Sequence, residues 1–289
     1  MIGLRSLFRL FALCALVGSA AAQVQVSLQV ARRSFVAGES VPVTVSITNL
    51  SGQDLNFQGS KGAGWIDFTV TSSRGVPMSP FGDPAFGSMK VPLGQTMARS
   101  FDLRRLFSLT QRGDYSVYAV IRLPGQNRDG FMSNRVAFTL DSALPYWTQR
   151  IGVSGQSGRE MRVLSYNNGS KNMLYSQVVD LKTGSPLQTH QLGEYLSFAK
   201  PSVTIDKKQV MHVLYLTGPT VWTHARISSD GAILGGELHK APGGGNPVLM
   251  TAQDGSVQVG NSIVYDPKAE AEARSKVRKA SDRPTAVYN

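Results

Sequence analysis

The stretch Pro201–Leu216, PSVTIDKKQVMHVLYL, decides how the second half of the chain is built. Apolar residues on either side of the polar segment 206–209 give the pattern of two β-strands joined by a tight turn. Part of this pattern recurs 46 residues later, where PVLMT at 247–251 matches PSVTI at 201–205 and is again followed by a polar turn and a short apolar strand. The recurrence predicts an internal repeat made of short strands.

A second pair of similar segments, 174–184 and 221–231, lies 47 residues apart, and each runs from a strand into a turn that ends in glycine. Repeats of 40 to 50 residues built from short strands resemble the blades of β-propellers. The resemblance implies that each repeat is a four-stranded antiparallel sheet. In the best-defined copy these strands contain Val203, His212 and Trp222, and the last one follows Gly231.

The predicted repeat domain covers residues 146–265, after a linker at 142–145, and this is room for about two and a half repeats. A closed propeller usually needs at least four blades. Three outcomes are therefore open. The favoured one is an incomplete ring, an open stack of two or three curved sheets. The others are a ring completed by a second copy of the chain, which would make a homo-oligomer, and a second sandwich or barrel.

Residues 23–141 alternate between apolar and polar positions, as in VQVSLQV at 24–30 and VPVTVSIT at 41–48. About seven short segments of this kind occur, separated by turn residues, and no helical pattern interrupts them. This pattern is typical of a two-sheet antiparallel sandwich. We also expect Trp65, at the start of one of these strands, to lie in its core because large aromatic residues of sandwiches usually pack inside.

Gly113-Asp114-Tyr115 leads into another alternating strand. It resembles the tyrosine corner of immunoglobulin-like and fibronectin-type sandwiches, in which the tyrosine hydroxyl bonds to the backbone a few residues upstream. The resemblance implies an immunoglobulin-like fold for residues 23–141. It implies no activity, because such sandwiches carry many unrelated functions.

Residues 1–22 have the pattern of a secretory signal peptide: Arg5 and Arg9, a short apolar run at 10–17, and Ala20-Ala21-Ala22 before Gln23. We expect cleavage after Ala22, a secreted or periplasmic location, and no transmembrane segment in the mature chain. The single cysteine, Cys14, lies inside this signal, so the mature chain has no disulfide and no cysteine metal ligand.

The formal net charge is +11, of which two units come from the predicted signal peptide. The remaining charge is spread thinly rather than clustered on one element. An even spread suits a solvated basic surface or weak attraction to anionic surfaces, and it argues against nucleic acid as a partner.

The segment 76–91, VPMSPFGDPAFGSMKV, is unusually apolar for a loop. Long ordered loops are often functional, and methionine and phenylalanine side chains suit adaptable contacts. We therefore predict a partner-contact surface, with the alternative that the loop packs on its own domain or on the next one. The candidate contact residues are Met78, Phe81, Phe86 and Met89.

No motif in the sequence nominates a catalytic residue, a cofactor site or a metal site. None of the four histidines pairs with another at a metal-ligand spacing, and no nucleophile elbow, phosphate loop or calcium loop occurs. His212 is expected to be a hydrogen-bonded core residue. The alternative is that His212 acts as a ligand. In that case His212 and His224 line one end of an axis around which the sheets fan. We expect no cofactor.

Residues 266–289 begin with a helix signal, in which Asp266 caps the helix and Pro267 takes its first position. The apolar content of this segment is almost all alanine, which predicts a solvated helix followed by a polar tail. A second interpretation is a basic peptide that docks on an anionic envelope polymer.

As a whole the chain resembles bacterial secreted proteins that join an immunoglobulin-like or fibronectin-like sandwich to propeller-like β-repeats. Because no catalytic constellation is found, we predict an exported non-catalytic binding or scaffold protein, not an enzyme, whose partner is a protein or glycan of the cell envelope. The alternative is a secreted carbohydrate-active hydrolase with its site between the two β domains. That alternative predicts that His212 or His224 meets a carboxylate.

Overall fold

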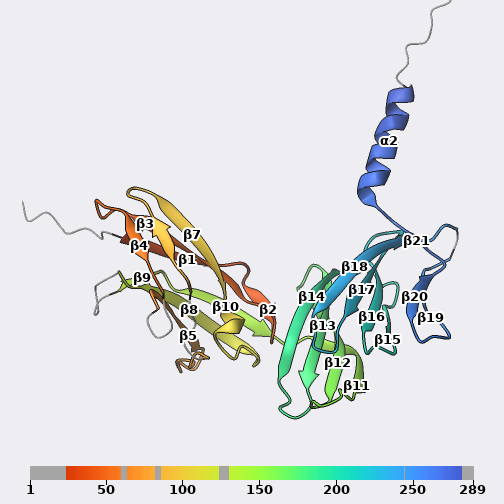
Figure 1. The fold of residues 1–289 in the computed structure, drawn as a ribbon, viewed down its shortest axis with the longest axis horizontal. Helices are drawn as coiled ribbons and strands as arrows, with labels where there is room; N and C mark the ends of the chain where they lie inside the picture. The colour runs from red at the N-terminus through yellow and green to blue at the C-terminus, as the bar shows by residue number, and fades with distance from the viewer. Residues whose placement is uncertain (1–23, 60–63, 82–85, 124–129, 244, 282–289) are drawn as a thin grey trace, which may run out of the picture. The chain divides into compact units, whose positions relative to one another are not determined.

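The computed structural model of the chain describes residues 24–59, 64–81, 86–123, 130–243 and 245–281. The described chain is nearly all β, and its one α-helix lies near the C-terminal end (Figure 1), which confirms the predicted class. The predicted signal peptide, residues 1–22, lies outside the described residues. Among the described residues, no helix is long and apolar enough to cross a membrane.

The chain divides into two compact units between Asp141 and Ser142, and the short segment Val36–Glu39 belongs to the second unit. The connection is shorter than the linker predicted at 142–145. The last strand before the division is β10 (Val136–Asp141) and the first strand after it, β11, already begins at Leu144, so only two residues separate them.

The first unit contains two main sheets. One has the order β1 (Val24–Val30), β3 (Pro42–Asn49), β7 (Thr96–Asp102). The other has the order β2 (Ser34–Val36), β10, β8 (Gly113–Ile121), β5 (Ile66–Ser72), with β9 (Phe131–Met132) paired to β8. A small third sheet pairs β4 (Leu55–Phe57) with β6 (Met89–Val91), so the end of the predicted loop 76–91 is a strand.

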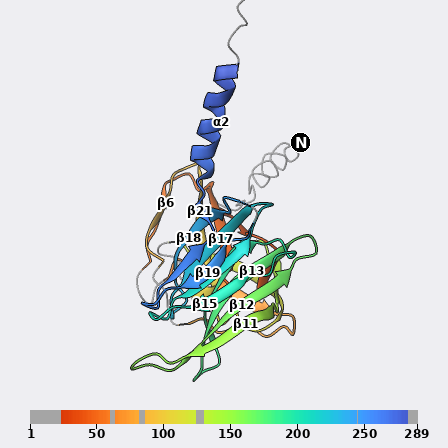
Figure 2. The same cartoon turned by 90° about the vertical axis from the view of Figure 1, so that its right-hand side faces the viewer.

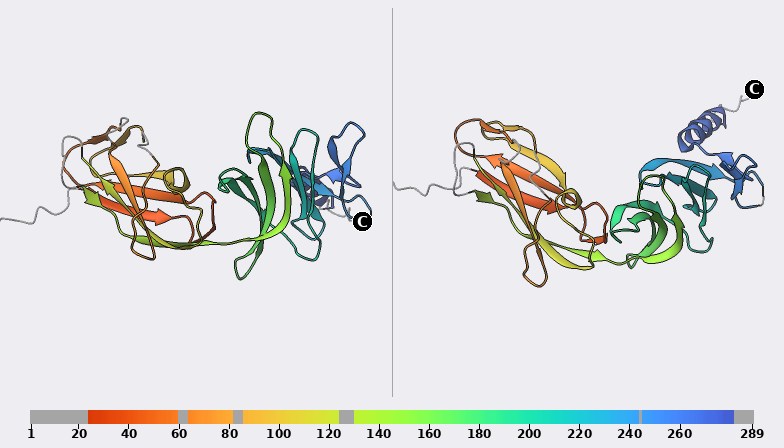
Figure 3. Two further views of the ribbon diagram at one scale, coloured as in Figure 1. Left: turned by 90° about the horizontal axis from the view of Figure 1, so that it is seen from below. Right: turned by 60° about the horizontal axis from the view of Figure 1, so that its bottom comes forward.

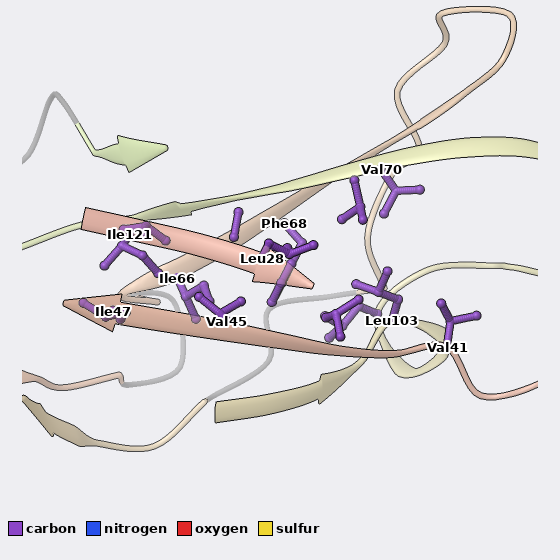
Figure 4. Close-up of a cluster of buried hydrophobic side chains, with 14 of the residues drawn as sticks. Leu28, Val41, Val45, Ile47, Ile66, Phe68, Val70, Leu103 and Ile121 are labelled. Atoms are coloured by element: carbon purple, nitrogen blue, oxygen red, sulfur yellow. The ribbon is translucent and has the colours of Figure 1, made fainter. Parts of the chain in front are cut away.

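Side chains of the two main sheets share one apolar core. Figure 4 shows Leu28, Val45 and Ile47 from β1 and β3 beside Ile66 and Ile121 from β5 and β8. The predicted alternation is what makes this possible, because buried residues alternate with more exposed ones along β1, β3 and β8.

Two predicted details of this core are confirmed. The hydroxyl of Tyr115 donates to the carbonyl oxygen of Gln111 at 2.9 Å, which is the expected tyrosine-corner bond. Trp65 is buried, and its ring nitrogen donates to the carbonyl oxygen of Gly87 at 2.8 Å. That bond satisfies the one polar atom that the indole brings into the interior.

The second unit contains three successive antiparallel sheets, seen from one side in Figure 2. The first is β11 (Leu144–Ile151), β12 (Arg159–Asn167), β13 (Asn172–Asp180), β14 (Pro186–Glu194). The second is β15 (Ser202–Ile205), β16 (Met211–Leu216), β17 (Val221–Ile227), β18 (Ile233–Lys240), with β21 (Ile263–Val264) added at its edge. The third is the hairpin β19 (Val248–Thr251), β20 (Val257–Gly260).

The strands of the middle sheet are the four that the repeat predicts, and the next copy stops after two strands, at β19 and β20. The three sheets follow one another along the unit (Figure 3), and the β-repeats form a propeller-like arrangement that does not close. The favoured prediction of an incomplete ring is therefore confirmed.

The inner strand β16 of the middle sheet is buried on both faces. One face, with Met211, Val213 and Tyr215, packs on the apolar core that it shares with the first sheet. The other face, with Leu214 and Leu216, packs on Leu249 and Val259 of the hairpin β19–β20. A strand covered on both sides reads as a continuous apolar run, which explains the sequence of β16, MHVLYL.

The C-terminal helix α2 (Pro267–Ser281) begins where the sequence predicts. A carboxylate oxygen of Asp266 accepts hydrogen bonds from the backbone nitrogens of Lys268 at 2.9 Å and Ala269 at 3.4 Å. These bonds satisfy two donors of the first turn, as an N-terminal cap does. Residues of the helix whose side chains are described are exposed apart from Glu270, as expected for a solvated helix.

Candidate functional site

Three histidines of the second unit gather on one face of the middle sheet, although they are far apart in the sequence. His212 lies on β16, His224 on β17 and His239 on β18, which are neighbouring strands. The registers Leu214↔His224↔Glu237 and Leu216↔Trp222↔His239 place these side chains on the face that meets the hairpin β19–β20.

His212 connects a turn aspartate to His224. Its Nδ1 lies 3.0 Å from Nε2 of His224, and its Nε2 lies 3.4 Å from Oδ2 of Asp206. A carboxylate oxygen can only accept, so His212 donates through Nε2. With both rings neutral, Nδ1 of His212 then accepts the proton of His224 Nε2, and the free lone pair of His224 lies on Nδ1.

The same reasoning fixes the tautomer of His239. The hydroxyl of Ser262 donates to the carbonyl oxygen of Val259 at 3.2 Å, so its oxygen accepts from Nδ1 of His239 at 3.1 Å. The lone pair of His239 therefore lies on Nε2. Among the described residues, this buried nitrogen has no hydrogen-bond partner. Leaving such an acceptor unsatisfied costs about 1–3 kcal/mol.

Glu237 brings a carboxylate to the two histidines of β17 and β18. Its Oε2 lies 3.8 Å from Nε2 of His239, and its Oε1 lies 3.5 Å from Nη2 of Arg226. Taking one ring nitrogen from His224 and one from His239, these atoms and one carboxylate oxygen of Glu237 all lie within 4.8 Å of one another. Glu237 is exposed whereas both histidines are buried, so the cluster opens to solvent on its carboxylate side.

Burial favours the neutral form of His224 and of His239 by lowering the pKa of each. It lowers the pKa of His224 to about 4, with smaller contributions from His212, His239 and the Arg226 guanidinium. Burial also lowers the pKa of His239, and the nearby Glu237 carboxylate opposes that shift. Neutral imidazole is the form that can accept a hydrogen bond or bind a cation.

The sequence-based expectations for the histidines are met in part. His212 is buried and hydrogen-bonded, as a core histidine should be, and it contacts His224. His239 and Glu237 were not expected to take part, because their spacings from His224 match no local metal motif. The missed signal is that all these residues occupy one face of consecutive antiparallel strands.

The four candidate contact residues belong to the first unit, whereas this cluster belongs to the second. Met78, Phe86 and Met89 are partly buried and pack against the core of the first unit, which is the alternative that the sequence left open. Phe81 is 53% exposed. The neighbouring residues 82–85 lie outside the described part of the chain. Only Phe81 of the four therefore offers a largely accessible ring.

Phe86 also borders a cavity of about 610 Å³ in the first unit. Its ring contacts Phe101 edge-on with a centroid distance of 5.2 Å, and the guanidinium of Arg99 lies 5.8 Å from the centroid of Phe101. Arg105 lines the same cavity, as do Asp102 and Leu106. The Asp102 carboxylate is engaged by the backbone nitrogens of Val41 and Arg104, both at 3.0 Å.

No family model matches the chain, and no curated protein matches it in sequence. Among solved structures it is similar to Spo0M, a sporulation control protein from Bacillus subtilis, with a TM-score of 0.28 and 9% identity over 89% of this chain and 97% of that one. It is also similar to red sea bream transglutaminase, with a TM-score of 0.29 and 12% identity over 77% of this chain and 30% of that one. Overlaps this low carry no argument about function.

Proposed function

We propose that the chain is an exported, non-catalytic binding protein of the cell envelope, and that its first unit, with an immunoglobulin-like fold, carries the binding surface. The observation that supports this most directly is the cavity lined by Phe86, Phe101, Arg99 and Arg105. Aromatic rings and guanidinium groups together suit a ligand that is partly apolar and negatively charged.

The partner that fits this chemistry best is an acidic glycan of the envelope, or a protein segment that carries carboxylates. The one acidic residue that lines the cavity, Asp102, is hydrogen-bonded to backbone nitrogens. The two arginine side chains outweigh its single negative charge, so the lining of the cavity is net positive. Phe81, exposed on the preceding segment, extends the candidate contact surface.

Two variants of the purified protein test this proposal. On a glycan array or in a pull-down with envelope fractions, Arg99→Gln and Arg105→Gln should weaken binding about tenfold each, because each removes a charge-assisted contact. Arg74→Gln is the matched control, since Arg74 lies on an exposed turn of the same unit. Absence of a partner at micromolar concentration, together with turnover in a hydrolase screen, would overturn the proposal.

The alternative, a secreted carbohydrate-active hydrolase, is favoured by one observation. His212 and His224 are buried but not isolated, because His212 contacts both Asp206 and His224. A hydrolase predicts turnover of a glycoside that is lost in His212→Asn, whereas a binding protein predicts no turnover in either form. The same hydrolase screen therefore separates the two functions.

A further inference from the structure

We propose that His224, Glu237 and His239 bind one divalent transition-metal ion of the Zn²⁺ class in the second unit. This site is independent of the binding function proposed for the first unit. It uses residues of β17 and β18 only, and these two strands are paired through seven register partners. Its donors are two imidazole nitrogens and one carboxylate oxygen.

The tautomer of His239 leaves its free lone pair beside the Glu237 carboxylate. Ser262 fixes the proton of His239 on Nδ1, so the lone pair is on Nε2, and Oε2 of Glu237 lies 3.8 Å from that atom. Two acceptors this close to each other repel unless a proton or a cation lies between them. Among the described residues no donor reaches His239 Nε2. A metal ion would satisfy both atoms at once.

The donor types select the class of ion. Two neutral imidazoles with one carboxylate are a ligand set for Zn²⁺ and related ions, whereas Mg²⁺ and Ca²⁺ prefer oxygen ligands throughout. With bonds of about 2.0–2.2 Å, tetrahedral donors lie about 3.3–3.5 Å apart. The three donor atoms lie within 4.8 Å of one another, so the cluster is wider than a bound ion requires, and its side chains would have to move together by up to about 1.5 Å on binding. A fourth position remains for solvent.

Each ligand also has an outer partner, as ligands of metal sites usually do. Ser262 accepts from the far nitrogen of His239. His212 holds His224 and is itself held by Asp206. Arg226 lies 3.5 Å from the second oxygen of Glu237. Because the Arg226 charge opposes a cation, we expect a dissociation constant on the order of 1 μM rather than the far tighter binding of structural zinc sites.

The test is isothermal titration of the full chain, purified without a histidine tag and stripped of metal by a chelator. Zn²⁺ should bind at one ion per chain, and Ca²⁺ and Mg²⁺ should give no binding in the same range. Glu237→Gln and His239→Gln should each weaken Zn²⁺ binding at least tenfold. His190→Gln is the matched control, because His190 lies on β14 of the preceding sheet, and it should bind as the unchanged chain does.

Two further measurements distinguish lost metal binding from lost folding and identify the ligands of the ion. Glu237→Gln removes the repelling carboxylate from an exposed position, so without metal it should melt no lower than the unchanged chain, which separates lost binding from lost folding. X-ray absorption of the zinc-loaded protein should show two imidazole nitrogens in the first shell. The proposal is overturned if no ion binds at stoichiometric level, if both variants bind as the unchanged chain does, or if His190→Gln abolishes binding.

Discussion

Nδ1 of His212 and Nε2 of His224 lie 3.0 Å apart across two neighbouring strands, and both rings are buried. Their rings stack with an interplanar angle of 20°. Because Asp206 accepts from the other nitrogen of His212, the protons along this series are ordered, and the order decides which nitrogen of His224 is free. A residue in a hairpin turn thus controls the chemistry of a histidine two strands away.

This relationship predicts that Asp206→Asn weakens Zn²⁺ binding about 10- to 100-fold, the usual effect of losing an outer partner of a metal ligand. Asparagine can keep the turn, because Oδ1 still accepts from the backbone nitrogens of Lys208 and Val210. It loses the carboxylate that fixes the tautomer of His212. Isothermal titration measures the change.

Asp254→Asn is the control for that experiment. Asp254 occupies the turn of the next hairpin, where its Oδ1 accepts from the backbone nitrogen and the hydroxyl of Ser256. It should leave Zn²⁺ affinity unchanged. Equal affinities for Asp206→Asn and the unchanged chain would show that the tautomer of His212 has no influence on the cluster.

The lowered pKa of His224 predicts a pH-dependent stability in metal-free protein. Burial lowers this pKa from 6.5 to about 4, so between these values the unfolded chain binds the proton and the folded chain does not. The contribution is fully present above pH 6.5 and is lost as the pH falls to about 4, with a total of at most about 3 kcal/mol. Urea unfolding at a series of pH values, with a chelator present, measures it.

His224→Gln should flatten that pH dependence. Glutamine can still donate to Nδ1 of His212 but has no proton to gain in this range. The comparison concerns the slope between pH 6.5 and about 4, so a uniform loss of stability in the variant does not affect it. An unchanged slope would mean that another group is responsible.

The sequence predicts the sheets of the second unit better than it predicts the cluster. The repeat at 46 residues identifies the strands around Val203, His212 and Trp222 because alternation and turn residues are local signals. The meeting of His224 with Glu237 and His239 depends on register and on which face each strand buries. Register is a pairwise property of two strands, so a single strand cannot reveal it.

The loop 76–91 shows the same limit in the first unit. Its apolar residues are visible in the sequence, but composition does not say whether they face a partner or their own core. Met78, Phe86 and Met89 pack on the core, whereas Phe81 is exposed. The tyrosine corner was predictable because its bond connects two residues close in sequence, Tyr115 and Gln111.

Tyr115→Phe tests how much the tyrosine-corner hydrogen bond contributes to the free energy of unfolding. The variant loses the hydrogen bond to the carbonyl oxygen of Gln111 but keeps the stacking of the ring on Phe138, whose centroid lies 5.6 Å away. We expect a loss of about 0.5–1.5 kcal/mol in the free energy of unfolding. Tyr118→Phe, on the same strand but facing the other way, is the control, and it should cost less than Tyr115→Phe, at most about 0.5 kcal/mol.

Gly231 shows how tightly successive sheets of the second unit pack. It ends the β17–β18 turn with a φ of +89°, and a Cβ placed on it would lie 2.5 Å from Cβ of Gln188 on β14. Gly184 takes the matching place in the β13–β14 turn, with a φ of +68°, but a Cβ there meets nothing within 4 Å. Both glycines therefore have a positive φ, which favours glycine. They differ in that a Cβ at position 231 would collide with Gln188, whereas a Cβ at position 184 would not meet any atom.

Gly184→Ala should lower the free energy of unfolding by about 1–2 kcal/mol, because alanine is strained at positive φ. Gly231→Ala should lose a further amount of about 1–3 kcal/mol, since Gln188 is part of a paired strand and has to move. Urea unfolding of the two variants under identical conditions gives the difference. Equal losses would mean that the contact of the β17–β18 turn with Gln188 of the preceding sheet does not resist a Cβ at position 231.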